Sequence, residues 1–257
     1  MCSNKSGFLD IYGATQDPET KAYMIVMQYA NDGNLFSYLD RNTTKLTWRM
    51  KVECLESIAR NLQNIHDKGL IHCDLHSGNI VLNNEKNSKK YDAHLSNPYI
   101  CDLGLSRPVD SSESNTSTIQ GVLPYIAPEV FHTNQFTQAS DIYSFGILMY
   151  LIASGEVPFR RRSFDRNLVC DILSGLRPTM PDSAPMTSKS LAQWCCDADP
   201  DKRPDAEELM KLIQNLREGD CDDLYDYNFV TPLSIIEKRK YSRMLLPTGD
   251  LPKPRNE

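Results

Sequence analysis

The residues best suited to chemistry lie between Ile71 and Leu82. This stretch places two imidazoles (His72, His76), a carboxylate (Asp74) and an amide (Asn79) between two apolar segments. In one interpretation, Asp74 orients a hydroxyl for phosphoryl transfer and Asn79 holds a metal ion. In the other, His72 and His76 form a His-x-x-x-His metal pair. The sequence farther along the chain decides between them.

Two further motifs follow this stretch in order. Asp102-Leu103-Gly104 comes directly after an apolar segment, and Ala127-Pro128-Glu129 follows a polar stretch. Together with His72 to Asn79, these motifs resemble the protein kinase family, and the resemblance runs from about Ile11 to Arg217. Three ordered motifs at compatible spacings are far more specific than any one of them alone.

The resemblance implies a role for each of these residues. Asp74 would orient the attacking hydroxyl, and Asn79 and Asp102 would bind Mg²⁺ against the phosphates of ATP. These three residues are therefore the predicted catalytic residues, and Asn79 and Asp102 are the predicted metal ligands. The substrate would be a protein hydroxyl. The sequence from Tyr125 to Glu129 favours serine or threonine over tyrosine, although Val122 replaces a threonine that serine/threonine kinases usually have there.

The resemblance also implies a nucleotide pocket. Met27 stands where the family has its gatekeeper residue, Gln28, Tyr29 and Ala30 stand at the hinge, and Val81 stands where an apolar side chain lies under adenine. A second interpretation of Met27 and Val81 is simply strand core.

Supporting residues follow from the same comparison. Asp141 would accept hydrogen bonds from the backbone of the catalytic loop, which would explain a carboxylate on an apolar helix. Glu129 and Arg203 would form a buried ion pair. The interpretation of His72 and His76 as a metal pair is disfavoured for two reasons. Cys73 stands where a zinc hydrolase of the His-Glu-x-x-His type has its glutamate, and Gly78 disfavours a long helix.

The sequence departs from the family pattern at two places. No glycine-rich loop and no strand lysine precede Phe8, so we expect a large lobe with only two strands of the small lobe, and weak phosphoryl transfer by this chain alone. A non-catalytic, pseudokinase-like binding module is the alternative. Cys73 replaces an arginine that reads a phosphorylated activation segment, so we expect that phosphate on the hydroxyls of residues 111–118 would not switch the protein by that route.

The elements around these residues can be predicted from local patterns. Two strands, Phe8–Tyr12 and Tyr23–Tyr29, should form a hairpin, and Ile80–Leu82 should pair with Tyr99–Cys101. Helices are predicted at Leu35–Leu39, capped by Asn31 or Asp32, and at Thr47–Lys68, with Thr47 as its N-cap. Further helices are predicted at Gln138–Ser154 and near 164–174, 187–196 and 204–217, the last with Pro in its first turn. The predicted class is α+β, with a small-lobe remnant and hinge at 1–30, a large lobe at 31–218 and an acidic, weakly ordered tail at 219–257.

Composition excludes several classes of protein. The 257 residues carry a formal net charge of -6, which argues against a nucleic-acid surface. No apolar run reaches the roughly 20 residues that a membrane span needs. The eight cysteines form no Cys-x-x-Cys pair, so reduced thiols in the cytosol, or in the nucleus, are expected. Besides its protein substrate, the chain could bind a docking partner through the acidic tail.

Overall fold

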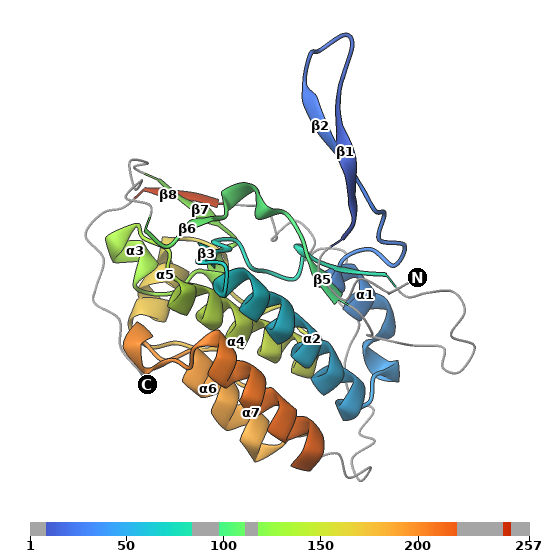
Figure 1. Cartoon of the computed structure of the whole chain (residues 1–257). Coiled ribbons are helices and arrows are strands. Elements are labelled where there is room, and N and C mark those ends of the chain that lie inside the picture. The colour runs from blue at the N-terminus through green and yellow to red at the C-terminus, as the bar shows by residue number, and fades with distance from the viewer. Residues whose placement is uncertain (1–8, 84–97, 111–117, 220–243, 248–257) are drawn as a thin grey trace.

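The computed structural model describes residues 9–83, 98–110, 118–219 and 244–247. Within these ranges, helices form one body and the strands form short antiparallel pairs, as Figure 1 shows. This arrangement confirms the predicted α+β class. The helices are α1 (Leu35–Asn42), α2 (Trp48–His66), α3 (Val130–Thr133), α4 (Gln138–Ser154), α5 (Arg166–Leu173), α6 (Met186–Cys195) and α7 (Ala206–Gly219).

Strands β1 (Ile11–Gln16) and β2 (Tyr23–Met27) form a hairpin that projects from the helical body (Figure 1). The carboxylate of Asp17 shapes its turn, because Oδ1 accepts hydrogen bonds from the backbone N–H groups of Glu19 and Thr20. Both strands are exposed along their whole length in the described structure. The predicted hairpin is confirmed, but its first strand begins three residues later than predicted.

The remaining strands are short. Strand β3 (Leu70–Ile71) pairs with β6 (Arg107–Pro108), and β4 (Ile80–Leu82) pairs with β5 (Pro98–Ile100). Strand β7 (Thr118–Gly121) pairs with β8 (Met244–Pro247). The pairing of β4 with β5 confirms the second predicted hairpin. Its connecting residues 84–97 lie outside the described residues, as do residues 111–117.

Helix α4 is the centre of the core. Fourteen of its 17 residues are buried, because this helix is apolar on nearly every face. Thr137 begins it with a capping box in which its side chain and that of Ser140 each accept from the other residue's backbone N–H. Gly155 ends it in the left-handed conformation, with φ +66°.

Helices α2 and α7 pack side by side on this core (Figure 1). The predicted N-cap Thr47 is confirmed for α2, since its hydroxyl accepts from the N–H of Met50. Two predicted starts are wrong. Asn34, rather than Asn31 or Asp32, caps α1 through the N–H of Ser37. Pro204 lies before α7, and Asp205 accepts from the N–H of Glu208 at the start of that helix.

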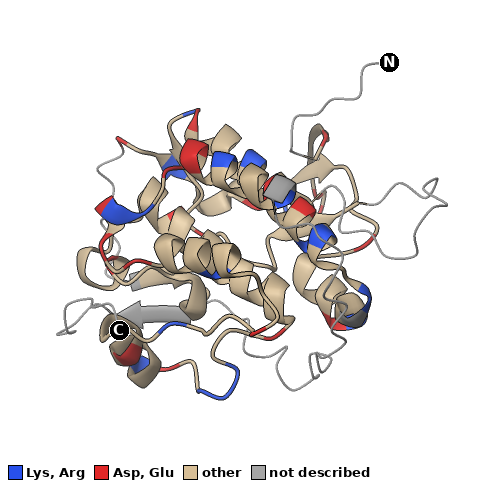
Figure 2. Ribbon diagram, turned by 90° about the horizontal axis from the view of Figure 1, so that it is seen from below, with Lys and Arg blue, Asp and Glu red and all other residues tan. Residues whose placement is uncertain are grey.

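The chain after α7 is described only in part. The predicted acidic tail at 219–257 lies mostly outside the described residues, and the described part, Met244–Pro247, forms strand β8. No helix among the described residues is both long and apolar enough to cross a membrane. Figure 2 shows Lys and Arg interspersed with Asp and Glu over the helices on this side of the molecule.

Candidate active site

The loop from Ile71 to Leu82 is buried between β3 and β4, and Asp141 of α4 fixes its first part. Oδ2 of Asp141 accepts from the backbone N–H of His72 at 2.8 Å, and Oδ1 accepts from that of Cys73 at 3.0 Å. Nε2 of His66 lies 3.0 Å from Oδ2. These bonds explain a carboxylate that is only 1% exposed on an apolar helix, and they confirm the predicted role of Asp141.

Asn79 orients Asp74 from the other end of the loop. Its Nδ2 atom donates to the main-chain O of Asp74 at 2.9 Å and to Oδ2 at 3.1 Å. The backbone N–H of Asp74 donates to Nδ1 of His72 at 3.2 Å. Asp74 is only 4% exposed, so its carboxylate is held in a defined orientation. The structure therefore brings the predicted residues Asp74 and Asn79 into direct contact.

Both histidines use one ring nitrogen within their own loop. Nδ1 of His72 accepts from Asp74, and Nδ1 of His76 accepts from the N–H of Gly78 at 3.0 Å. Nε2 of His72 lies 3.2 Å from the carbonyl O of Cys101 and donates to it. Burial lowers the pKa of His72, so its imidazole is neutral at neutral pH. His72 is therefore a packed, hydrogen-bonded loop residue and not one half of a metal pair.

His76 lies beside the carboxylate of Asp74. Its Nε2 atom is 3.6 Å from Oδ2 of Asp74, and its ring packs at a tilt against Tyr125 with centroids 6.0 Å apart. Gly78 makes this position possible, because a Cβ atom there would lie 2.6 Å from Cε1 of His76. His76 and Gly78 thus fit each other as a pair beside Asp74.

Strands β4 and β5 are antiparallel, so the residues that follow β5 lie beside those that precede β4. Asp102 follows β5, and Asn79 directly precedes β4. The N–H of Cys101 donates to the carbonyl O of Asn79 at 2.9 Å, which places the next residue, Asp102, beside this end of the loop. Asp102 has φ +60°, in the left-handed region that costs a non-glycine residue about 1 kcal/mol. It is exposed, and Oδ1 accepts from the N–H of Gly104 at 3.4 Å.

These residues fit a magnesium ion. Mg²⁺ prefers hard oxygen ligands, usually one or two carboxylates together with phosphate oxygens. Asp102 supplies an exposed carboxylate. Asn79 uses its amide nitrogen for Asp74, so its amide oxygen is available for a cation. These oxygen groups are of the kind that Mg²⁺ prefers, and the metal role of Asn79 and Asp102 stays a prediction.

The predicted nucleotide residues lie at the junction of hairpin and helical body. Residues 31–34, which follow the predicted hinge, are joined to β4, because the N–H of Asp32 donates to Leu82 O at 3.1 Å and that of Leu82 donates to Gly33 O at 2.9 Å. Val81 pairs with Asn34 in an isolated bridge. Gln28 donates its N–H to Asp10, and Ala30 is half-buried.

Met27 and Tyr29 are the exposed members of the predicted pocket. Met27 is 42% exposed and Tyr29 is 80% exposed. Met27 is therefore not strand core, because β1 and β2 pair only with each other among the described residues. Val81 is half-buried, between a core and a surface position.

Glu129 and Arg203 form an ion pair outside the loop around Asp74. Nη1 and Nη2 of Arg203 each lie 2.7 Å from one carboxylate oxygen of Glu129, which makes the pair bidentate. Nη1 also donates to Ala139 O, and Nε donates to Asp197 O. The Arg203 side chain is fully buried, so the predicted buried ion pair is confirmed.

Cys73 contributes no charge to the site. It lies at φ +67° and is 6% exposed. Burial raises the pKa of its thiol to about 12, so the group stays protonated and neutral at physiological pH. The side chains of residues 111–118, whose hydroxyls the sequence offers as phosphate acceptors, lie outside the described part of the structure.

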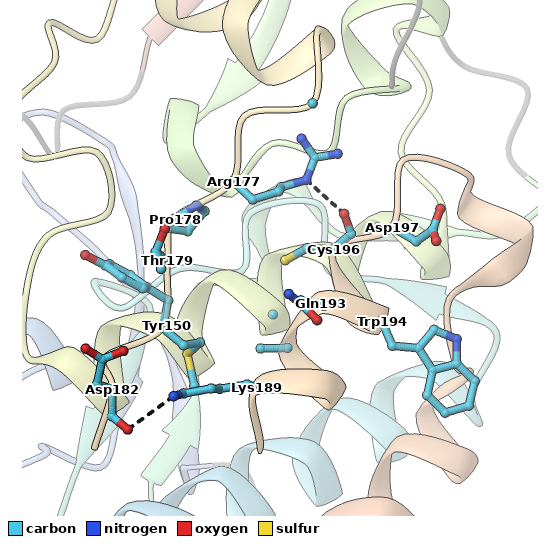
Figure 3. A pocket seen from close by; sticks show the side chains of 14 residues that line it. Tyr150, Arg177, Pro178, Thr179, Asp182, Lys189, Gln193, Trp194, Cys196 and Asp197 are labelled. Carbon is cyan, nitrogen blue, oxygen red and sulfur yellow. Dashed lines mark hydrogen bonds between the residues drawn. The ribbon is translucent and has the colours of Figure 1, made fainter. Parts of the chain in front are cut away.

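A groove of about 860 Å³ lies elsewhere, between the second half of α4, residues 175–182 and α6 (Figure 3). Nε of Arg177 donates to Cys196 O at 2.8 Å along its wall, and Nζ of Lys189 donates to Asp182 O at 3.1 Å. No residue of the loop from Ile71 to Leu82 lines this groove. It is separate from the cluster around Asp74.

Two contributors could not be identified from the sequence. His66 stands at the end of α2, and its partner Asp141 is 75 residues away, so no local pattern links them. Gly121 lies beside Asp74, since a Cβ atom there would be 3.8 Å from Oδ1. Its φ of +150° is a backbone conformation that favours glycine, but this angle is known only from the structure.

Comparison with known proteins agrees with this geometry. The family described as protein tyrosine and serine/threonine kinase matches residues 3–213. A probable serine/threonine-protein kinase of Dictyostelium discoideum is 31% identical over 208 residues, which cover 79% of this chain and 14% of that protein. Two more proteins with this description, from the same organism, are each 26% identical. They cover 88% and 82% of this chain and 12% and 22% of their own lengths. The chain thus spans less than a quarter of each of these relatives.

Proposed function

The chain belongs to the protein kinase family, and we propose that its site transfers the γ-phosphate of ATP to serine or threonine hydroxyls of proteins. The observation that carries this proposal is the buried cluster of Asp74, Asn79 and the backbone that leads to Asp102. The serine/threonine preference rests on the relatives, which are named as serine/threonine kinases.

Asp74 acts on the acceptor hydroxyl in this proposal. Phosphoryl transfer needs little covalent help from the protein, so the main task is to orient the hydroxyl toward the phosphorus. Asn79 and His72 fix the carboxylate and the backbone of Asp74, respectively. The fixed carboxylate can therefore accept the hydroxyl proton without first reorganising.

Asn79 and Asp102 would hold magnesium, which neutralises charge on the phosphate oxygens when it is bound. The amide oxygen of Asn79 and the carboxylate of Asp102 come from two segments that a backbone hydrogen bond joins. Asn79 also contacts Asp74, so one side chain connects the acceptor end of the site with the phosphate end. Met27 to Ala30 and Val81 would line the adenine end.

We further propose that these 257 residues alone transfer phosphate slowly. They contain no Gly-x-Gly-x-x-Gly, and the one lysine that precedes β1 in the sequence, Lys5, is too close to that strand to be the phosphate-binding lysine. Without such a clamp, ATP would be bound and aligned poorly, and alignment is a large part of the catalytic effect. The exposed faces of β1 and β2 also offer little enclosure for a nucleotide.

A second candidate is a non-catalytic binding module of the same family. The exposed hairpin favours it, because Ile11, Tyr23 and Ile25 present apolar side chains that are 67%, 81% and 67% exposed. Such a module would bind proteins through its surface and would not respond to nucleotide.

For either function we propose the cytosol or the nucleus as the location, since the cysteines of the described residues are free thiols. Fractionation of cells that express the tagged chain tests this location.

Transfer of radiolabelled phosphate from ATP to a mixed protein substrate tests the proposal. We expect slow turnover that Asp74→Asn abolishes, because this substitution keeps the size of the side chain but removes the carboxylate. Asp182→Asn, at the separate groove, should leave turnover unchanged. Equal turnover with Asp74→Asn would contradict the role of Asp74. Turnover within the range of about 1 to 100 s⁻¹ that is typical of kinases would contradict the proposed impairment.

A further inference from the structure

The C-terminal strand β8 pairs with strand β7. The register pairs Thr118 with Pro247, Ile119 with Leu246, Gln120 with Leu245 and Gly121 with Met244. Figure 1 shows β8, drawn in red, beside β7 at the edge of the helical body. The two strands come from distant parts of the chain, so no hairpin turn imposes this pairing.

Strand β7 is a fixed platform next to Asp74. Ile119 is 1% exposed and the following Val122 is 2% exposed, so the strand is anchored in the core. Its last residue, Gly121, approaches Asp74 so closely that an added Cβ atom would lie 3.8 Å from Oδ1. A segment paired with Gly121 therefore passes beside the carboxylate that the proposed function assigns to the acceptor hydroxyl.

We propose that the outer edge of β7 is a docking edge for an extended protein segment, and that β8 occupies it in cis. A strand that adds to an exposed edge gains affinity from main-chain hydrogen bonds and selectivity from its side chains. The segment Met244 to Pro247 is uncharged and apolar, with proline at its end. The matching partner is thus an uncharged, extended apolar segment, and an acceptor protein must displace β8 to reach the edge.

Displacement of β8 from β7 should cost little free energy. A pair of strands with only four residues each is marginally stable by itself. Strand β8 is therefore suited to act as a reversible cover. Its effect on catalysis rests on the proposed function, whereas occupation of the edge does not.

Hydrogen exchange in the full chain tests the occupation directly. The variant Leu245→Pro/Leu246→Pro removes two N–H groups of β8, and Leu251→Pro is the control at a position after this strand. We expect backbone amides of residues 118–121 to exchange about tenfold faster in the double variant only. Equal exchange in the double variant and the control would overturn the proposal.

A labelled peptide of residues 240–250 provides the second measurement. It should bind the double variant, whose edge is open, and bind the wild type and Leu251→Pro much more weakly. Equal binding to all three would overturn the proposal. Neither readout needs phosphate transfer, so a failure here is distinct from a failure of the proposed function. A rise in transfer to an added protein in the double variant would extend the result to catalysis.

A cysteine pair tests the register without proline. Gln120→Cys/Leu245→Cys places the two thiols on facing residues, and mild oxidation should join them. Gln120→Cys/Leu251→Cys should form little of the corresponding crosslink. Equal crosslinking of both pairs would contradict the register on which the proposal rests.

Discussion

The amide of Asn79 holds Asp74 at two points, because Nδ2 donates to its main-chain O at 2.9 Å and to Oδ2 at 3.1 Å. One side chain thereby fixes both the backbone and the carboxylate of the residue proposed to orient the acceptor. It also carries the amide oxygen proposed for magnesium. Asn79 is the link between the two halves of the site.

Substitution of Asn79 should therefore affect stability and not only activity. Asn79→Ala removes both bonds from buried groups of Asp74 and should cost about 1 to 3 kcal/mol. Asn79→Asp should cost more, because a second carboxylate then faces Oδ2 in a buried site. Urea unfolding measures both values. Equal stability of Asn79→Asp and wild type would contradict this description of the contact.

Gly78→Ala should disturb His76. The new Cβ atom would lie 2.6 Å from Cε1 and 2.9 Å from Nδ1 of the imidazole, so the ring must move and lose its bond to the N–H of residue 78. We expect a loss of about 1 to 3 kcal/mol. Addition of His76→Ala should recover part of this loss, with a coupling of about 1 kcal/mol or more. Strictly additive effects in the double-mutant cycle would show that the two residues do not constrain each other.

Loss of one partner of the Glu129–Arg203 pair should be strongly destabilising. Glu129→Gln leaves a fully buried guanidinium without its carboxylate and should cost about 3 to 5 kcal/mol. Glu207→Gln is the matched control, because its pair with Lys211 is exposed and should be worth less than about 1 kcal/mol. Denaturant unfolding of both variants provides the comparison. Similar losses of unfolding free energy in the two variants would contradict the prediction that a buried ion pair is more sensitive to loss of one partner than an exposed pair.

His72 should make the protein less stable in mild acid. Its pKa is lowered in the folded state by burial, although the charges of Asp141 and Asp74 oppose this shift. The unfolded chain therefore binds a proton below about pH 6.5 that the folded chain does not, and stability falls as the pH decreases below this value. His72→Gln removes this group, so its melting temperature should fall less than that of the wild type between pH 7.5 and 5.5. Parallel curves would contradict the prediction.

Local signals in the sequence predicted the elements better than the contacts between them. The cap Thr47 and the length of α4 depend on neighbouring residues, so the local pattern was sufficient to predict them. The cap of α1 was assigned wrongly because Asn31, Asp32 and Asn34 all suit that role chemically. Only the backbone geometry selects Asn34.

Contacts between distant segments were predicted only where the family resemblance supplied them. The bonds of Asp141 to the loop and the pair of Glu129 with Arg203 belong to this group. The pairing of β8 with β7 has no local signal, because strand partners are set by tertiary structure. The exposure of Met27 was missed for the same reason, since an apolar strand residue is expected to be covered.

A thermal-shift measurement tests the site most directly. If Asn79 and Asp102 hold magnesium against ATP, then ATP should raise the melting temperature more with Mg²⁺ than with a chelator. This magnesium-dependent increment should disappear in Asp102→Asn and persist in Asp182→Asn. An unchanged increment in Asp102→Asn would contradict the assigned metal ligands. The absence of any shift in the wild type would contradict nucleotide binding by this chain and leave the non-catalytic binding module.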